Sequence, residues 1–525
     1  MTVATRHRRP GARRAAGSAA PRGYARLAAV LVLALALGAC DRAAPTRETA
    51  AWPAACPPLV RPEPFSLEAA REAWRKAEER HEARIREAAS PGAFLRDARA
   101  WLAATPRPCL GDLADLGEKL FEHEFNYADG LGGGDAARST KGPFRRVHEG
   151  LFGGPETLSC TSCHWVGGPN GAGAETDDAF LSGDGERPDS GDARNPQALV
   201  ALGVVEALAR EMSAELQAGR DALVRGGGGE KRLSAKGVDF GVLRVGADGQ
   251  VDASGLAGVD ADLVVKPFGW KGTRPDIESF ATEALQVHLG IQGDDLVAGG
   301  RAEEAGGGKD AADPDGDGVK DEFGRGLMNA LVTHLALLEM PIVEPLVQDR
   351  KLSAPATGLF PPTTTSFVED FARGREAFHA AGCANCHVPR MVLRDPVLRL
   401  EGLPPIDLAA SMRKPGLAYD AAAGGYPVWL FSDLKRHDMG VDNTAHHLQR
   451  GVGLAMYLTP RLWGVADSAP YLHDGRAPSL DYAIAGHGGE GTAARAAYAA
   501  MPPEEKGALR VYLMSMRRAP RVTIP

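Results

Sequence analysis

The sequence predicts an all-α protein that consists of two similar helical units, with a small β insertion in the first unit and an N-terminal helical extension. Apolar residues at helical spacing precede each of two five-residue motifs, at 160–164 and 383–387, and recur at 502–516 near the end of the chain. Strand-like alternation is confined to 236–265. The 525 residues are enough for two or three domains.

Each predicted helix has a start signal or an apolar face. The helix before the second motif begins with a capping box formed by Ser366 and Glu369. In the N-terminal extension, two helices are expected within 66–104, one starting at Ser66 and one at Pro91. The apolar faces before the two motifs are Leu113, Leu116, Leu120 and Phe121 in the first unit, and Phe367, Phe371 and Phe378 in the second.

The expected organisation has five parts. They are a signal peptide over 1–39, a linker over 40–65, the helical extension over 66–110, a first unit over 111–345 and a second unit over 346–525. The β insertion belongs to the first unit, with strands expected at 238–245 and 263–265. The glycine-rich stretches 226–229 and 298–308 are expected to be loops.

The N-terminal segment resembles an export signal. Seven arginines and no acidic residue precede an apolar run, Leu27–Leu37, that is too short to span a bilayer. The run ends in Leu-Gly-Ala before Cys40, which resembles a bacterial lipobox and predicts a lipid on that cysteine. The alternative is an ordinary signal peptide with a chance cysteine. The expected location is the periplasm-facing side of a membrane of the bacterial envelope.

Removal of 1–39 leaves 53 basic against 68 acidic residues. This acidic balance argues against binding to nucleic acid. The partners expected are the membrane, through Cys40, and a small redox protein or a quinol-linked electron donor or acceptor.

Two motifs account for four of the seven cysteines. Cys160-Thr-Ser-Cys163-His164 and Cys383-Ala-Asn-Cys386-His387 both have the form C-x-x-C-H, which attaches c-type haem. The two thiols reach the two vinyl groups of one porphyrin, and the adjacent histidine binds the iron. A zinc site would need further cysteine ligands that the chain does not offer. The sequence therefore predicts two covalently bound haems, named haem one and haem two in chain order.

The remaining pair, Cys56 and Cys109, is expected to form a disulfide because an exported protein reaches an oxidising compartment. Two buried free thiols are the alternative.

A short internal repeat supports the two-unit organisation. Trp270–Glu278 aligns with His473–Asp481, and a histidine followed by a turn comes after each: His288 after the first copy and His487 after the second.

Several segments resemble bacterial di-haem cytochrome c peroxidases, and in particular the di-haem oxidoreductase branch that is often called thiol-oxidoreductase-like. The resemblance implies two cytochrome c domains whose haems exchange electrons, and a peroxidase-like oxidoreductase activity. An electron carrier without substrate chemistry and a haem-based redox or gas sensor are the alternatives. The segments are Arg461–Arg476, Phe431–Gly440, His487–Glu490, Arg194–Gly203 and Pro267–Gly272.

The resemblance also indicates residues for the distal sides of the haems. The position of the family's distal methionine for the C-terminal haem matches His487, with Met439, His437 and His473 as alternatives. His288 is the candidate distal ligand or acid–base group at haem one.

Two further positions correspond to functional residues of the peroxidases. Trp270 resembles the tryptophan that lies between the haems, and ordinary core packing is the alternative. No glutamate clearly matches the distal acid, and Glu283 is the nearest candidate.

An acidic loop predicts a calcium site, because carboxylates at alternating positions around glycine turns converge on one hard cation. Gly324 stands where an EF-hand would have its last glutamate, so a shorter loop is expected, with a solvated acidic turn as the alternative. The candidate ligands are Asp313, Asp315, Asp317 and Asp321.

Overall fold

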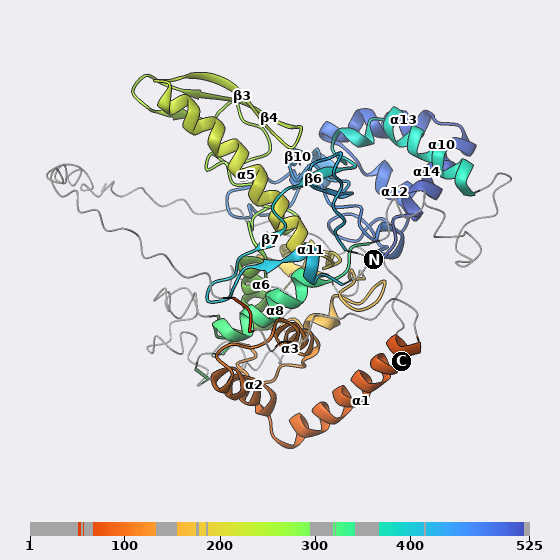
Figure 1. The fold of residues 1–525 in the computed structure, drawn as a ribbon. Helices are drawn as coiled ribbons and strands as arrows, with labels where there is room; N and C mark the ends of the chain where they lie inside the picture. Colours follow the sequence, from red (N-terminus) through yellow and green to blue (C-terminus); the bar gives the residue numbers. More distant parts are fainter. Residues whose placement is uncertain are drawn as a thin grey trace, which may run out of the picture. The chain divides into compact units, whose positions relative to one another are not determined.

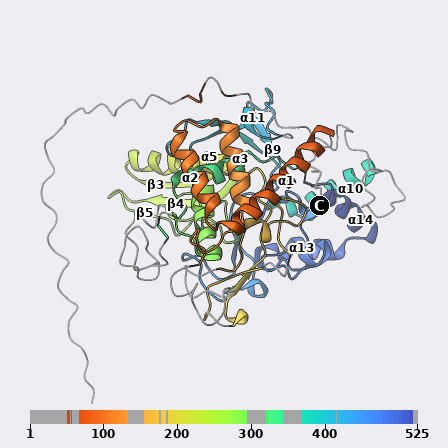
Figure 2. The ribbon, with the colours of Figure 1, turned by 90° about the horizontal axis from the view of Figure 1, so that it is seen from below.

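Two helix pairs organise the computed structural model of the chain. The model describes residues 51–53, 56, 67–132, 155–174, 178–184, 187–293, 319, 320, 322–341, 367–413 and 416–518, which belong to one compact unit. Helix α3 (Leu110–Glu122) pairs with α8 (Arg325–Leu337), and α10 (Phe367–Ala380) pairs with α14 (Pro503–Met514). Figures 1 and 2 show α10 and α14 side by side.

A glycine permits the close crossing in each pair. A Cβ on Gly117 of α3 would lie 2.0 Å from the carbonyl oxygen of Ala330 in α8. A Cβ on Gly374 of α10 would lie 2.1 Å from the carbonyl oxygen of Ala508 in α14. In both entry helices a buried phenylalanine follows four residues later, Phe121 or Phe378. The two helix pairs therefore share one packing scheme.

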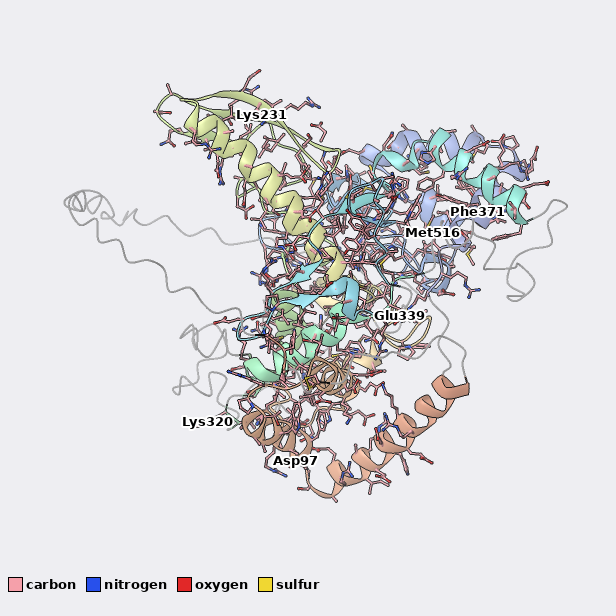
Figure 3. All side chains as sticks on the ribbon, in the orientation of Figure 1. Asp97, Lys231, Lys320, Glu339, Phe371 and Met516 are labelled. Carbon is pink, nitrogen blue, oxygen red and sulfur yellow. A yellow bond between two sulfur atoms is a disulfide. The ribbon has the colours of Figure 1, made fainter. Side chains whose placement is uncertain are left out.

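The second pair has its own apolar core. Acidic Glu369 and Asp370 stand in the first turn of α10, and Pro503 opens α14, as helix starts favour. Phe371 and Met516, both labelled in Figure 3, belong to this core. The first pair belongs to a larger core that also includes the long helix α5 (Leu202–Arg225).

The internal repeat is a structural repeat as well. In each copy a backbone bridge closes the turn, Phe268 with Arg274 and Tyr471 with Ala477. A side chain then caps the next helix: Asp276 caps α6 (Ile277–Ala284), and Ser479 caps α12 (Leu480–Ala485). The turn glycines Gly272 and Gly475 have φ values of 60° and 70°, which favour glycine.

The prediction of an all-α fold is wrong, because strands occur in both halves and the fold is mixed α/β. Within the described ranges the strands form five sheets of two or three strands. Most of these strands have only two or three residues, which is too short to show a two-residue period in the sequence. The pairs are β1 (Ala179–Leu181) with β2 (Asp192–Arg194), β6 (Met391–Leu393) with β9 (Tyr426–Val428), β7 (Val397–Leu398) with β8 (Ile406–Asp407), and β10 (Arg436–Asp438) with β11 (Met456–Leu458).

The largest sheet is the predicted β insertion. It contains β3 (Gly229–Ala235), β4 (Val238–Val245) and β5 (Val251–Asp252) and packs beside α5 in Figure 1. β4 has the predicted bounds, whereas 263–265 is not a strand. The expected loop at 226–229 is a turn over 226–228, and Gly229 begins β3.

The predicted N-terminal extension forms α1 (Leu67–Ala89) and α2 (Ala93–Ala104). The sequence did not predict α5 or α8. The remaining short helices are α11 (Leu408–Ser411) and α13 (Thr492–Ala500). None of the described helices is both long and apolar enough to cross a membrane.

Several predictions fall outside the described residues. These are the signal segment, the lipid site at Cys40, the loop at 298–308, and the calcium ligands Asp313, Asp315, Asp317 and Asp321. Cys56 and Cys109 are described, and a disulfide with a Cα–Cα distance of 5.4 Å joins them.

Candidate haem sites

The first motif follows α3 and forms a tight 3₁₀ turn at Cys160–Ser162. The hydroxyl of Ser159 caps this turn by accepting a hydrogen bond from the backbone N–H of Ser162. The turn places the motif at a cavity whose walls include Cys160, Cys163 and His164. Among the described residues, neither cysteine is part of a disulfide.

The ring of His164 is oriented as an iron ligand requires. Its Nδ1 lies 3.2 Å from the carbonyl oxygen of Gly171 and 3.0 Å from that of Gln197, so Nδ1 carries the hydrogen and donates it. Nε2 then keeps its lone pair, as in metal sites where a carbonyl fixes the other ring nitrogen. Burial, together with the nearby charge of His288, lowers the pKa of His164 to about 4. The imidazole is therefore neutral and can coordinate a metal.

The cavity beside His164 has apolar walls. Residues of the entry helix α3, of α6 and of α8 line it, so both helices of the α3–α8 pair contribute to its walls. The apolar lining includes Phe121, Leu199, Phe280, Leu285, Leu331 and Leu335. Such walls suit a porphyrin ring.

Two buried cations line the same cavity. Arg194 is only 6% exposed, and among the described atoms its Nε has no hydrogen-bond partner. Lys271 is 1% exposed and donates to the carbonyl oxygens of Gly453 and Leu454, at 3.2 and 2.5 Å. Burial, helped by the charge of Arg194, lowers the pKa of Lys271 to about 7. Arg194, and Lys271 in its protonated form, fit a cofactor that carries carboxylates, as haem does.

His288 lines the same cavity from a single π-helical turn, Leu285–Leu289, that continues α6. Its Nδ1 lies 2.5 Å from Oε2 of Glu156. The backbone N–H of Glu156 in turn donates to the carbonyl oxygen of His288 at 2.7 Å. Burial alone would lower the pKa of His288, but the charge and hydrogen bond of Glu156, with the charge of Glu283, outweigh burial and raise it.

Glu283 also lines the cavity, but arginines take both of its oxygens. Oε2 accepts from Arg274 at 2.8 Å, and Oε1 accepts from Arg450 at 3.3 Å. Burial would raise the pKa of Glu283, and the two arginines outweigh it, so the pKa lies below its usual range. A carboxylate held in this way is a poor proton donor. Glu156, which the sequence did not single out, is the acid in contact with His288.

The second motif is built like the first. It follows α10 and forms a 3₁₀ turn at Cys383–Asn385. Nδ1 of His387 donates to the carbonyl oxygen of Phe431 at 3.0 Å. Burial, together with the neighbouring His487, lowers the pKa of His387 to about 4. This histidine too is neutral, with Nε2 left to coordinate.

His487 faces His387. The centres of the two imidazole rings are 6.4 Å apart, and Nδ1 of His487 donates to the carbonyl oxygen of Ala483 at 2.8 Å. Two nitrogens that each lie about 2.0–2.1 Å from one metal place their ring centres roughly 6 Å apart, once the distance from nitrogen to ring centre is added. The distance between the ring centres is therefore close to that of two imidazoles bound to one metal.

The alternatives to His487 have other partners. Both ring nitrogens of His437 face carboxylates: Nε2 lies 2.8 Å from Asp433 and Nδ1 lies 2.8 Å from Glu490. Burial opposes the charged form, but these contacts raise the pKa of His437 to about 11. The ring of His473 is stacked on Tyr457. The backbone carbonyl of Met439 accepts from Asn443, a contact that does not involve the thioether sulfur.

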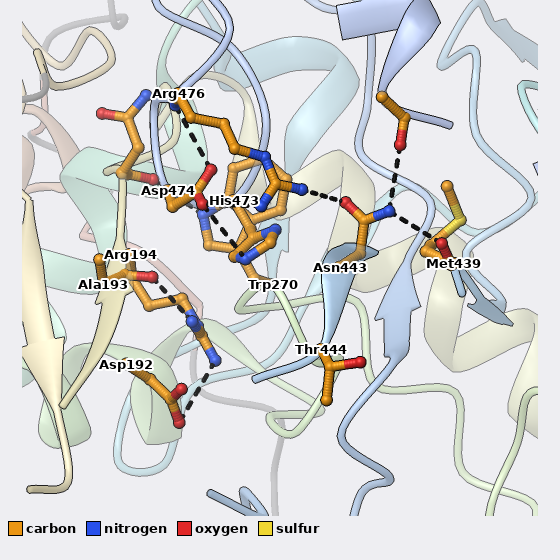
Figure 4. Close-up of polar contacts among 12 residues, drawn as sticks. Asp192, Ala193, Arg194, Trp270, Met439, Asn443, Thr444, His473, Asp474 and Arg476 are labelled. Atoms are coloured by element: carbon orange, nitrogen blue, oxygen red, sulfur yellow. Dashed lines mark hydrogen bonds and ion pairs between the residues drawn. The ribbon is translucent and has the colours of Figure 1, made fainter. Parts of the chain in front are cut away.

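Trp270 joins the two halves of the protein. Its Nε1 donates to the carbonyl oxygen of Asn195 at 2.8 Å, and the backbone N–H of Asn195 donates to the carbonyl oxygen of His473 at 2.7 Å. The rings of Trp270 and His473 meet edge to face at 6.5 Å between centres (Figure 4). Trp270 also lines the cavity of the first motif.

A family comparison agrees with the second of these two sites. Residues 357–516 match the family model described as "Di-haem oxidoreductase, putative peroxidase". The match includes the second motif and His487, and it confirms the resemblance predicted from the sequence for this part of the chain. The first motif lies before the matched residues.

Comparisons with whole proteins give weaker likenesses. A MauG-like protein associated with microbial copper homeostasis is 15% identical, with a TM-score of 0.25, over 52% of this chain and 76% of that chain. A hydrazine synthase structure from Kuenenia stuttgartiensis is 19% identical, with a TM-score of 0.20, over 36% of this chain and 55% of that chain. At these TM-scores the likeness supports no comparison of sites. A search of curated protein sequences gave no match.

The sequence did not single out Glu156, Lys271 or Asp433 as site residues. Glu156 stands four residues before Cys160 and Lys271 directly follows Trp270, but a lone glutamate or lysine has no signature by which it could be found. Asp433 and His437 are four residues apart, yet they lie outside any helix, so helical spacing would not have paired them.

Proposed function

We propose that the protein is an exported, lipid-anchored c-type cytochrome that holds two covalent haems and acts as a peroxidase-like oxidoreductase with electron transfer between the haems. The observation that carries the proposal is the pairing of each C-x-x-C-H histidine with a second histidine. His387 faces His487, and His164 shares its cavity with His288. Haem c, when bound, supplies an iron that exchanges single electrons and takes small ligands where an axial position is open.

The two sites differ in how the second histidine is held, and this asymmetry supports an enzyme. His487 donates to the carbonyl oxygen of Ala483, in the helix directly before it, and has no carboxylate partner among the described residues. His288 is bound to the carboxylate of Glu156. Glu156 keeps the proton on Nδ1 of His288 and leaves Nε2 to accept or donate a proton beside a small ligand such as peroxide. The first site is therefore the proposed reactive centre.

Trp270 is the proposed relay between the sites. It lines the first cavity and meets His473 of the second half, and the backbone of Asn195 links the two by hydrogen bonds. An aromatic ring in contact with both halves shortens the path that an electron has to cross.

The proposed location is the periplasmic side of a membrane, with the chain anchored through a lipid on Cys40. The basic segment, the apolar run and the small residues before Cys40 support this location. The proposed partner is a small redox protein or a quinol-linked donor or acceptor. A calcium ion at Asp313, Asp315, Asp317 and Asp321 is part of the same proposal.

An electron carrier without substrate chemistry is the second candidate. The presence of a second histidine at both sites favours it, because an iron held by two imidazoles has no open position.

The haem count tests the core of the proposal. Denatured protein in alkaline pyridine should give a c-type spectrum with about two haems per chain. Cys160→Ser or Cys383→Ser should lower the count to about one. A count of one in the unmodified protein would contradict the proposal.

A further inference from the structure

The loop that carries His487 is connected to the second attachment motif by a chain of polar contacts. The backbone N–H of Asp433 donates to the carbonyl oxygen of Cys386 at 2.9 Å. The carboxylate of Asp433 lies 2.8 Å from Nε2 of His437, whose Nδ1 lies 2.8 Å from Glu490. The path therefore starts at the haem attachment residue Cys386 and ends three residues after His487.

The backbones of the two loops are also in direct contact. A Cβ on Gly489 would lie 2.1 Å from the carbonyl oxygen of Asp438, and a Cβ on Gly488 would lie 2.6 Å from that of Met439. Glu490 closes the contact, because its Oε1 accepts from the backbone N–H of Asp438 at 2.9 Å. Only glycine permits this approach, so the His-Gly-Gly-Glu sequence is fitted to the loop at 436–440.

The charges in this chain alternate in sign. Both ring nitrogens of His437 face carboxylate oxygens, so both carry hydrogen, and the ring is a cation between two anions. The side chains of Asp433 and His437 are 2% and 9% exposed, whereas that of Glu490 is 51% exposed. The contact between Asp433 and His437 is buried and fixes the ring of His437. The contact between His437 and Glu490 connects that ring to the loop of His487 at the protein surface.

We propose that Asp433, His437 and Glu490 form a tether that couples the attachment motif of haem two to the loop of its distal ligand and keeps His487 in place. The inference rests on the proposed ligation by His487. The three residues are positioning residues, because each acts through the loop and not on the iron. The competing explanation is that they stabilise the fold and have no effect on the ligand.

Glu490 is the residue to change, because its half-exposed side chain can be replaced without leaving a buried charge unpaired. Glu490→Ala removes both contacts to the neighbouring loop, so part of the low-spin ferric signal of haem two should be lost and a high-spin signal should appear. The reduced protein should then bind carbon monoxide at haem two. Glu490→Gln should restore the low-spin signal, because the amide oxygen still accepts from the backbone N–H of Asp438.

Glu504→Ala is the matched control, since Glu504 is an exposed glutamate in the first turn of α14 and makes none of the contacts described for Glu490. All variants are compared as full-length protein at equal haem content. The tether is overturned if His487→Ala gives a high-spin haem two while Glu490→Ala stays low spin and inert to carbon monoxide. If His487→Ala itself leaves the low-spin signal intact, His487 is not the ligand, and the proposed ligation fails together with the tether.

Discussion

The imidazole rings of His387 and His487 lie 6.4 Å apart between centres, and each directs its Nδ1 to a backbone carbonyl oxygen. Two rings fixed in this way leave two Nε2 atoms for one iron. His164 and His288 share a cavity, but the partner of His288 is the carboxylate of Glu156. Both sites therefore bring a second histidine near the histidine of the motif, but they differ in what holds that second histidine.

The first prediction concerns this difference. His487→Ala should convert haem two from low spin to high spin, because it removes the second axial imidazole. His288→Ala should chiefly change the reaction of haem one with peroxide or small ligands. Electron paramagnetic resonance of the oxidised protein, with and without peroxide, measures both effects. If both irons of the unmodified protein stay low spin and inert to peroxide in both redox states, the electron-carrier alternative replaces the enzyme.

The second prediction concerns Glu206, whose carboxylate accepts from the backbone N–H of Ile277 at the start of α6. Burial raises the pKa of Glu206 to about 7, with a further contribution from Asp276. The folded state therefore binds this proton more tightly than the unfolded state. The stabilisation is fully present below the ordinary glutamate pKa of about 4.3 and is lost as the pH rises through about 7.

Glu206→Gln keeps the hydrogen-bond acceptor and removes the titration. At pH 8 it should raise the free energy of unfolding by about 1–3 kcal/mol, whereas at pH 4 it should have little effect. Urea denaturation at the two pH values measures the difference. A change in the free energy of unfolding of equal size at both pH values would contradict the raised pKa of Glu206.

The third prediction concerns the helix crossings. Gly374→Ala should destabilise the fold by about 1–3 kcal/mol, because the new Cβ meets the carbonyl oxygen of Ala508. Gly507 directly precedes Ala508 on α14, and a Cβ added there would have nothing within 4 Å. Gly507→Ala should therefore stabilise the helix by about 0.5–1 kcal/mol. Thermal melting of the two variants provides the comparison. Equal effects would mean that the crossing is looser than the structure shows.

The fourth prediction concerns the acidic loop. Asp315→Ala combined with Asp317→Ala should lower the melting temperature only when calcium is present, because an ion that binds the native state stabilises it by mass action. Melting curves with calcium and with a chelator test this. Unchanged curves for the unmodified protein would show that the loop is a solvated acidic turn.

The sequence predicted the parts of the fold that follow a local rule. The helices α1, α2, α3, α10 and α14 have regular apolar spacing or start signals, and β4 has clear alternation. Helix α8 was missed because all of its residues from Leu327 to Leu337 are buried, so it has no polar face to mark its period. The two-residue strands were missed because their pairing depends on partners far along the chain.

At the sites, sequence reasoning found the residues that belong to motifs. The attachment cysteines and His487 stand in recognisable patterns, and the structure places His487 opposite His387. It could not predict that Glu156 would meet His288, because 132 residues separate them. It also could not show that Glu283 is occupied by two arginines, since a charge network is a property of the folded chain.

The disulfide between Cys56 and Cys109 also determines how a mechanical load travels through the molecule. Cys109 directly precedes α3, the helix that leads to the first motif. A pull on Cys40, the proposed lipid site, passes along 16 residues to Cys56 and then crosses the disulfide to α3. Helices α1 and α2 lie in the closed loop, so the covalent path of that force bypasses them. While the disulfide is intact, both helices can move or unfold without lengthening the covalent connection from the proposed lipid site to α3. If the disulfide were reduced, the chain from Cys56 to Cys109, with both helices, would become part of that connection.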